Sequence, residues 1–264
     1  MFALSALHMA ESEPDNEDII QTHRKYLAMA LAEHKQDVLD LNQSNFDAVL
    51  LTSSLLRITA FAMLRERPLT PYAPPIQWLE MTRGAMNLFR ESWKWVEKDE
   101  TSMAFRLTQR MPIVWDEEGK FAASNREGLE HLLHRDEEDK ANEPWPPDVM
   151  EAYETTISYI GCILIAMKDK AMLGEVRRRL VIFPYIVRSK YIELVKERKP
   201  RALTVLAYYF ALVAHFGSNV WWIGGSGARE VRALEGALQG KWREHMAWPL
   251  QQVSEQGPPP LTQP

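Results

Sequence analysis

The feature that most constrains the fold is a long apolar run between Lys199 and Gly227. Pro200 stands where a helix can begin, because the N–H that proline lacks would have no partner in the first turn. From Leu203 to Phe216 the residues leave almost no polar face. A helix that is apolar all round is buried at the centre of a domain. The run therefore predicts a central helix with the rest of the fold packed around it.

The same run ends in a tryptophan pair and a glycine-rich turn. Gly217 and Ser218 predict the helix end, since glycine enters the left-handed C-terminal cap without a steric penalty. One reading is a core helix closed by a tight turn, and the other is the wall and lip of a ligand pocket. In the second reading the pocket residues supply aromatic surface or allow close backbone approach, and they are Tyr208, Phe210, Trp221, Trp222, Gly224, Gly225 and Gly227.

Composition narrows the class of protein. Hydrophobic residues make up 46% and charged residues 25%, as in a soluble globular chain. The first residues lack the features of a secretion signal, and no apolar run reaches about 18 residues without a charge, so we expect no membrane span. The single cysteine, Cys162, excludes a disulfide framework and a multi-cysteine metal site within this chain. A net charge of −5 argues against direct DNA binding by this chain alone.

Helical periodicity recurs along the chain, and no alternating strand pattern is present. We expect an all-α fold: a single multi-helix domain of about ten helices over residues 1–250, followed by a disordered tail at 251–264. The main helices expected lie at 15–41, 46–66, 75–89, 125–135, 147–167, 176–182, 185–196 and 200–216.

Capping signals suggest where two of these helices begin. Ser44 with Asp47, and Ser124 with Glu127, resemble the arrangement in which two side chains cap the first turn reciprocally. The segment 135–147 is charged, rich in proline and poor in aliphatic residues. It predicts a surface loop or linker.

No constellation for catalysis or metal binding stands out. His131 and His134, with Glu127 and Glu130, have helical spacing that could hold a metal ion, but their charged surroundings favour a solvated helix end. His215 has no identifiable nucleophile or carboxylate partner, so a buried histidine with a hydrogen-bond partner is the better interpretation. We expect no cofactor and no metal.

Two residue groups have ordinary structural interpretations. The basic cluster Arg177, Arg178 and Arg179 predicts a solvated helix face, with a phosphate or partner site as the alternative. Met63, Met81, Met86 and Met167 are compatible with core packing or with a pocket for a bulky apolar ligand, and core packing is the better interpretation.

Several segments carry a family resemblance: ALSALHMA, HRKYLAMALAEH, NFDAVLLTSSLL, WLEMTRGA, RKPRALTVLAYYFALVAHFGSNVWWIGGSG and KWREHMAWP. The chain resembles the C-terminal regulatory domain of fungal zinc-cluster (Zn2Cys6) transcription factors, in the branch of the sterol-uptake regulators. The resemblance implies an all-α domain with a hydrophobic ligand pocket, where a sterol binds and controls nuclear entry. The family's glycine-rich loop corresponds to Gly224, Gly225 and Gly227, preceded by Trp221 and Trp222.

One departure leaves alternatives open. The family's DNA-binding module needs six cysteines, and this chain has one. Either the zinc cluster has been removed, or this is a relative without one. In the first interpretation, the protein is a ligand-responsive regulator in the nucleus. We further expect that it shuttles between the nucleus and the cytoplasm. The second admits a cofactor-free cyclase or isomerase, or a carrier, acting on an apolar metabolite through Tyr208, Tyr209 or His215. In a third interpretation, the chain acts by binding another protein, either a second copy of itself in a homodimer or a full-length transcription factor.

Overall fold

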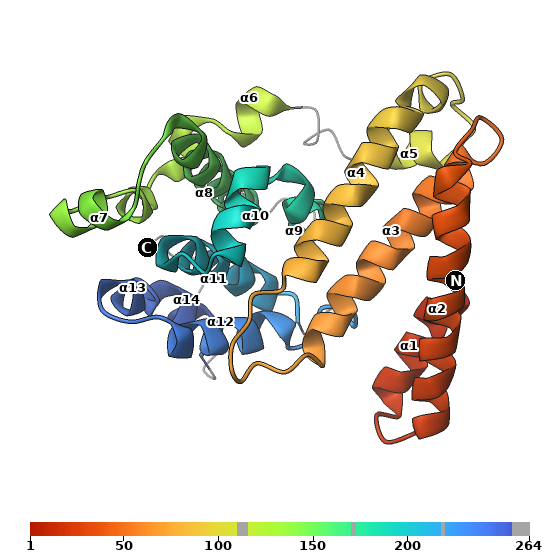
Figure 1. The fold of residues 1–264 in the computed structure, drawn as a ribbon, viewed down its shortest axis with the longest axis horizontal. Coiled ribbons are helices and arrows are strands. Elements are labelled where there is room, and N and C mark those ends of the chain that lie inside the picture. Colours follow the sequence, from red (N-terminus) through yellow and green to blue (C-terminus); the bar gives the residue numbers. More distant parts are fainter. Residues whose placement is uncertain (110–115, 170–172, 218–219, 255–264) are drawn as a thin grey trace. The chain divides into compact units, whose positions relative to one another are not determined.

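The computed structural model describes residues 1–109, 116–169, 173–217 and 220–254 (Figure 1). Every regular element in these ranges is a helix, which confirms the all-α prediction. Contacts divide the chain into two units, residues 1–63 with 81–110 and residues 64–80 with 111–264. That residues 1–250 act as one domain stays a prediction.

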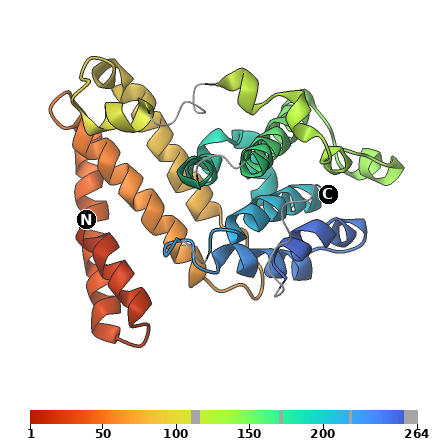
Figure 2. The ribbon, with the colours of Figure 1, turned by 180° about the vertical axis from the view of Figure 1, so that it is seen from behind.

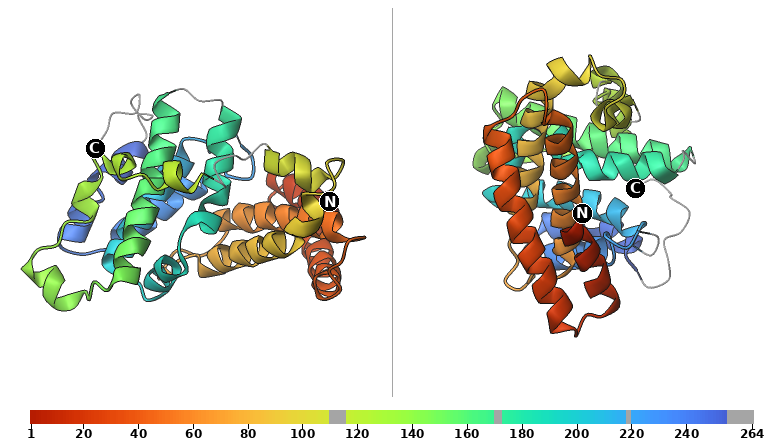
Figure 3. Two further views of the ribbon diagram at one scale, coloured as in Figure 1. Left: turned by 90° about the horizontal axis from the view of Figure 1, so that it is seen from above. Right: turned by 90° about the vertical axis from the view of Figure 1, so that its right-hand side faces the viewer.

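The first unit is built on a pair of long helices at the N-terminus. Helices α1 and α2 pack along each other (Figure 3). His23 of α2 is buried there, with its Nδ1 2.9 Å from the carbonyl oxygen of Ala3 in α1. The helices that lie wholly or partly in this unit are α1 (Phe2–Ser12), α2 (Glu17–Leu39), α3 (Phe46–Ala62), α4 (Ile76–Val96) and α5 (Met103–Gln109).

Asp47 caps a helix other than its own. Its carboxylate accepts hydrogen bonds from the N–H groups of Met103 and Ala104, at 3.1 and 2.7 Å, so it satisfies the start of α5. The predicted capping pair of Ser44 and Asp47 at α3 is therefore wrong. The N-cap of α3 is Asn45, which makes no side-chain capping bond. Folding places the start of α5 against the first turn of α3, and the carboxylate meets those unpaired donors instead.

The second unit is arranged around one buried helix, α11 (Pro200–Ala214), as the apolar run predicts. All of its residues from Arg201 to Val213 are buried, and Pro200 occupies its first turn. Around it lie α8, α9, α10, α12, α13 and α14. The other elements of this unit are η1 (Met63–Arg65, at its boundary), α6 (Glu117–Lys120), η3 (Ala123–Arg126), η4 (Glu130–Leu132), α7 (Glu137–Asn142), α8 (Pro147–Lys168), α9 (Leu173–Ile186), α10 (Ser189–Lys196), α12 (Ser226–Ala237), α13 (Lys241–Glu244) and α14 (Ala247–Gln252).

Aromatic packing holds α9 against α11. The ring of Tyr209 stacks on that of Phe183, with centroids 3.9 Å apart, and its hydroxyl donates to the carbonyl of Leu180 at 3.0 Å. The hydroxyl of Tyr191 in α10 likewise donates to the carbonyl of Ala202 at 3.0 Å. The polar tips of these buried rings are thus satisfied by backbone carbonyls, as buried phenols require.

Close backbone approach joins α12 to α11 (Figure 2). A Cβ placed on Gly227 would lie 2.6 Å from the carbonyl oxygen of Phe210 and 2.6 Å from the backbone nitrogen of Ala214. A Cβ on Gly217 would lie 2.4 Å from the carbonyl oxygen of Gly224. Both positions therefore need glycine because of space.

The predicted left-handed cap at Gly217 is wrong. The left-handed residue in this region is Gly224, with φ of 49°, while α11 ends at Ala214 and is followed by a right-handed His215. Ser218 lies outside the described residues. Gly217 and Gly227 allow the chain after α11 to pack closely against neighbouring backbone, whereas the C-terminal cap of α11 does not need a glycine.

A buried carboxylate links α12 to the segment before α4. Glu230 is fully buried and pairs with the guanidinium of Arg67 through two hydrogen bonds, at 2.5 and 2.7 Å. It also accepts from the hydroxyl of Tyr72 at 3.2 Å. Breaking a buried pair by removing one partner is costly, so this carboxylate fixes the path of the chain around residues 67–72.

The segment 124–135 does not form the helix expected of it. The side chain of Ser124 makes no capping bond, and the segment holds two short 3-10 turns instead. Gly128 interrupts it with a φ of 80°. Asn125 packs tightly on α8, where a Cβ on Gly161 would lie 1.7 Å from its carbonyl oxygen. Tertiary packing thus overrides the local helix signal.

Two further expectations concern long apolar helices and the C-terminal tail. Two helical segments, Phe46–Arg65 and Pro147–Lys168, are long and apolar enough to cross a membrane by length and composition alone. Both segments contain charged residues, so the expectation that no long run is free of charge still holds, and 72% of the second window is buried inside the fold, as in a core helix. Gln251 and Gln252, assigned to the tail, end α14, and residues 255–264 lie outside the described ranges.

The methionines differ from their predicted role. Met63 and Met81 are exposed, at 45% and 38%, and Met167 is half-buried. The side chain of Met86 lies outside what the structure describes. Core packing is therefore wrong for Met63 and Met81.

The packing of α12 on α11 makes a testable prediction. Gly227→Ala should lower the free energy of unfolding by about 1–3 kcal/mol, because the added methyl group overpacks a backbone contact. Gly236→Ala is the matched control on the same helix, since a Cβ there meets nothing within 4 Å. It should leave stability unchanged or raise it by up to about 1 kcal/mol. Urea unfolding followed by circular dichroism measures both, and equal effects would contradict the packing.

Candidate functional site

The most heavily constrained side chain of the second unit is Arg201, which is fully buried near the start of α11. Its guanidinium pairs with Glu143 at 2.8 Å and with Asp139 at 3.2 Å. It also donates to the carbonyl oxygens of Leu132 and His134, at 2.6 and 2.9 Å. An arginine can be buried this deeply only because carboxylates and carbonyls replace its water.

Aromatic rings enclose this ion pair. The Arg201 guanidinium carbon lies 4.6 Å from the ring centroid of Trp242 and 5.0 Å from that of Trp145. Trp145 stacks in turn on Tyr153, whose hydroxyl donates to Glu143 at 2.9 Å. Rings over a guanidinium attract it and keep water away, which strengthens the charge pairs.

Helix α7 brings the acidic partners to Arg201. Asp136 and Asp139 form a reciprocal capping box at its start, in which each side chain accepts from the backbone N–H of the other. Asp139 is buried, so the segment expected to be a surface loop or linker instead contributes to the interior. We did not predict this helix from the sequence. An aspartate at the N-cap, Asp136, followed by acidic residues in the first turn is nevertheless a recognised signal for a helix start.

Lys241 of α13 closes the same cluster from the other side. Its ammonium lies 2.6 Å from a carboxylate oxygen of Asp136 and 2.6 Å from one of Asp139. The hydrogen bond from Lys241 lowers the pKa of Asp136. The two cations and the acids of α7 therefore form one connected network.

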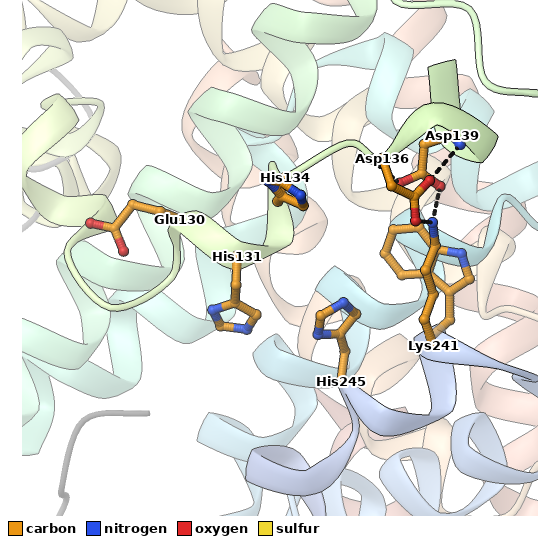
Figure 4. Close-up of a pocket in the computed structure, with 8 residues that line it drawn as sticks. Glu130, His131, His134, Asp136, Asp139, Lys241 and His245 are labelled. Carbon is orange, nitrogen blue, oxygen red and sulfur yellow. Dashed lines mark hydrogen bonds and ion pairs between the residues drawn. The ribbon is translucent and has the colours of Figure 1, made fainter. Parts of the chain in front are cut away.

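A pocket of about 370 Å3 opens beside this network (Figure 4). The rings of His131 and His245, which both line it, lie next to each other in the figure, with centroids 5.4 Å apart. Trp242 packs beside His245 at 5.6 Å. The residues that line the pocket come from the segment 130–139 and from α13 with the residue after it, and they are Glu130, His131, His134, Asp136, Asp139, Lys241, Trp242 and His245.

Burial favours the neutral form of both His131 and His245. Burial lowers the pKa of His131, although a backbone hydrogen bond with Gly128 acts in the opposite direction. Burial also lowers the pKa of His245, and the charge of Arg201 adds to that effect. The Nε2 of His131 lies 2.9 Å from the hydroxyl of Tyr208, and burial raises the pKa of that phenol. The pair is thus a neutral imidazole and a neutral phenol.

The histidine segment is in part the solvated helix end expected for it, because Glu127, Glu130 and His134 are exposed, although the segment holds a short 3-10 turn in place of a helix. His131 is half-buried and contacts Tyr208, because the chain turns at Gly128 and folds back over α11. No group of three or more histidine, cysteine or carboxylate side chains among the described residues has the arrangement of a metal site.

The seven residues predicted to form a ligand pocket do not gather at this pocket. Tyr208 lies behind it, bonded to His131 and stacked on Trp248 with centroids 5.0 Å apart. Phe210 is fully buried and packs near Trp78, at 5.9 Å. The two residues are two positions apart on one helix, so they point to different sides of it.

The other five lie in and after the turn that follows α11. Trp221 and Trp222 are half-buried, and the carbonyl of Trp221 accepts from Arg65 at 2.8 Å. Gly227 is buried against Phe210, whereas Gly225 is exposed and a Cβ there would meet nothing within 4 Å. The turn therefore has one side packed on α11 and one side open.

Two further expectations concern polar residues of the core. His215 has the partner predicted for it, since its Nε2 lies 3.0 Å from the side-chain oxygen of Gln252. Arg179 departs from the solvated face expected for residues 177–179. Its guanidinium pairs with Glu175 and contacts the sulfur of buried Cys162 at 2.9 Å.

The buried charge network makes a testable prediction. Arg201→Met should lower the free energy of unfolding by about 3–5 kcal/mol, because Asp139 and Glu143 remain buried without their counter-charge. Lys241→Met is the control: it removes a cation from the same Asp139 at a position that is 29% exposed, where loss of an ion pair costs less than at a fully buried one. Chemical denaturation of both variants measures the difference. Equal losses would show that Arg201 has no special role.

Comparison with known proteins identifies two relatives whose sequences match most of this chain. The Zn(2)-C6 fungal-type transcription factor afumD of Aspergillus fumigatus is 28% identical over 224 residues, which are 83% of this chain and 56% of that protein. A Zn(2)-C6 fungal-type transcription factor of Gibberella zeae is 24% identical over 264 residues, covering 95% of this chain and 51% of that protein. No model of a known protein family and no solved structure matches the chain.

The coverage limits what the relatives say. The chain spans about half the length of the curated relatives it matches, so what those whole proteins do is not carried over by the match alone. The match does extend over most of this chain. The resemblance to fungal zinc-cluster transcription factors is therefore confirmed, since the relatives found are Zn(2)-C6 fungal-type transcription factors, and the branch of the sterol-uptake regulators stays a prediction.

Proposed function

We propose that this chain is a regulatory region of a fungal transcription regulator. The observation that carries the proposal is the similarity to two Zn(2)-C6 fungal-type transcription factors over 83% and 95% of the chain. With one cysteine and a net charge of −5, the chain holds neither a six-cysteine zinc cluster nor a basic surface charge suited to DNA. It therefore acts on transcription in the nucleus through another DNA-binding module.

The second part of the proposal is that a sterol-like or other apolar metabolite regulates this activity. The turn after α11 supports it, because Trp221 and Trp222 offer partly exposed aromatic surface beside the open side of Gly225. Phe210 and Gly227 form the packed back of this turn, and Gly224 shapes it. Tyr208 would act indirectly, from its place beside His131.

A ligand at this turn has a physical route to the rest of the unit. The turn joins α11 to α12, and α12 holds the buried Glu230 that fixes Arg67. A ligand that binds one packing of these helices better than another shifts their populations by its difference in affinity. Regulation then follows from repacking of α12, without any contact between ligand and DNA.

The test of the regulatory role uses the full chain fused to an unrelated DNA-binding domain with a reporter gene in a fungal host. The fusion should change reporter output relative to the DNA-binding domain alone, and a sterol-synthesis inhibitor should alter that change. The unfused chain should not retard DNA in a gel-shift assay. A fusion that leaves the reporter unchanged in both conditions would overturn the proposal.

The test of the ligand site uses one charged substitution with a matched control. Gly225→Asp should weaken ergosterol binding on the order of tenfold, because a carboxylate at an apolar contact must be desolvated. Gly84→Asp adds the same charge in α4, at another glycine whose Cβ meets nothing within 4 Å, and should leave affinity unchanged. Tryptophan fluorescence during titration with ergosterol measures both. Equal affinities, or no binding by the parent chain, would remove the sterol from the proposal.

A further inference from the structure

The pocket beside Arg201 has walls suited to a flat ring. Four aromatic side chains line it, namely Trp242 and three histidines, and the ring centroid of His245 lies 5.4 Å from that of His131 and 5.6 Å from that of Trp242. At these separations the protein's own rings contact one another, so they form a continuous aromatic wall on which a flat ring can stack. Its volume of about 370 Å3 is at the lower end of the range of small-molecule pockets, so it suits a small ligand.

The charges around the pocket are unbalanced. Lys241 and Arg201 supply two positive charges, whereas the carboxylates that line or back the pocket supply four negative ones, so the sum is −2. His131 and His245 do not offset this, because burial lowers the pKa of each and favours its neutral form. The four carboxylates are Glu130, Asp136, Asp139 and Glu143.

Both cations are already paired with carboxylates. The guanidinium of Arg201 is fully buried and already bonded to two carboxylates and two carbonyls. The ammonium of Lys241 is bonded to Asp136 and Asp139. An anion in the pocket would therefore meet net negative charge with no free counter-charge, and a cation would be attracted.

His245 is one of the polar groups of the pocket that a ligand can reach. His245 faces the pocket, and none of the described residues makes a hydrogen bond with its imidazole (Figure 4). His131, by contrast, already bonds Tyr208. A neutral imidazole presents one donor and one acceptor, so it can bond an N–H or O–H group on a ring stacked beside it.

We propose that this pocket is a second binding site, which takes a small ligand with a planar ring, neutral or positively charged, and excludes anions. His245 bonds the polar group of the ligand, and His131 and Trp242 contact its ring. The site is separate from the turn after α11 and does not depend on the regulatory role proposed above.

The experiment uses three probes with the same ring and different charges: neutral indole, cationic tryptamine and anionic indole-3-acetate. Each is titrated into the purified full chain at pH 7.5, and binding is followed by isothermal titration calorimetry and ligand-observed NMR. Tryptamine should bind most tightly, and its affinity should exceed that of indole-3-acetate by at least about tenfold. No saturable binding of any probe, or equal affinity for the cation and the anion, would overturn the proposal.

Two substitutions assign the binding to this pocket. His245→Phe keeps a ring but removes both nitrogens, and should weaken tryptamine binding several-fold; His8→Phe, at an exposed histidine of α1, should not. Glu130→Gln removes one surface carboxylate of the pocket, and it should reduce the difference in binding affinity between cationic tryptamine and neutral indole. Tryptamine affinity unchanged by both pocket variants would place the binding elsewhere and contradict the assignment.

Discussion

The second unit depends on the burial of one positive charge. Arg201 stands near the start of the most buried helix, where a guanidinium without partners would be very unfavourable. The chain meets this requirement by folding residues 130–143 over the helix, so that two carboxylates and two carbonyls bond the guanidinium. An acidic stretch that would otherwise remain in water is thereby fixed in place, and the pocket beside it takes its shape.

The same helix also organises its opposite side by sterics. Gly227 lets α12 approach the backbone of α11 more closely than any side chain would permit, and Glu230 then ties α12 to Arg67. One side of α11 is therefore specified by charge and the other by the absence of a side chain. The proposed apolar ligand site is at the turn between α11 and α12, and the proposed site for a neutral or cationic ring is beside the buried charges, so the expected ligands differ in polarity.

Much of the helical framework could be predicted because its signals are local. Proline at the first turn of α8 and of α11, and the apolar run of α11, depend only on nearby residues. The failures involve distant partners. Asp47 caps α5 rather than α3, and the acids at 136 and 139 bond a lysine and an arginine far along the chain. No local pattern predicts such pairings, and so the sequence alone did not single out His245 and Trp242 beside the buried charges.

The central claim is that Arg201 holds residues 130–143 against α11, and hydrogen–deuterium exchange tests it most directly. In Arg201→Met, exchange should rise in peptides covering 130–143 and 241–245 while the amides of 203–213 stay protected, because local opening needs less free energy than global unfolding. Unchanged exchange in 130–143, or a uniform rise along the whole chain, would contradict the claim.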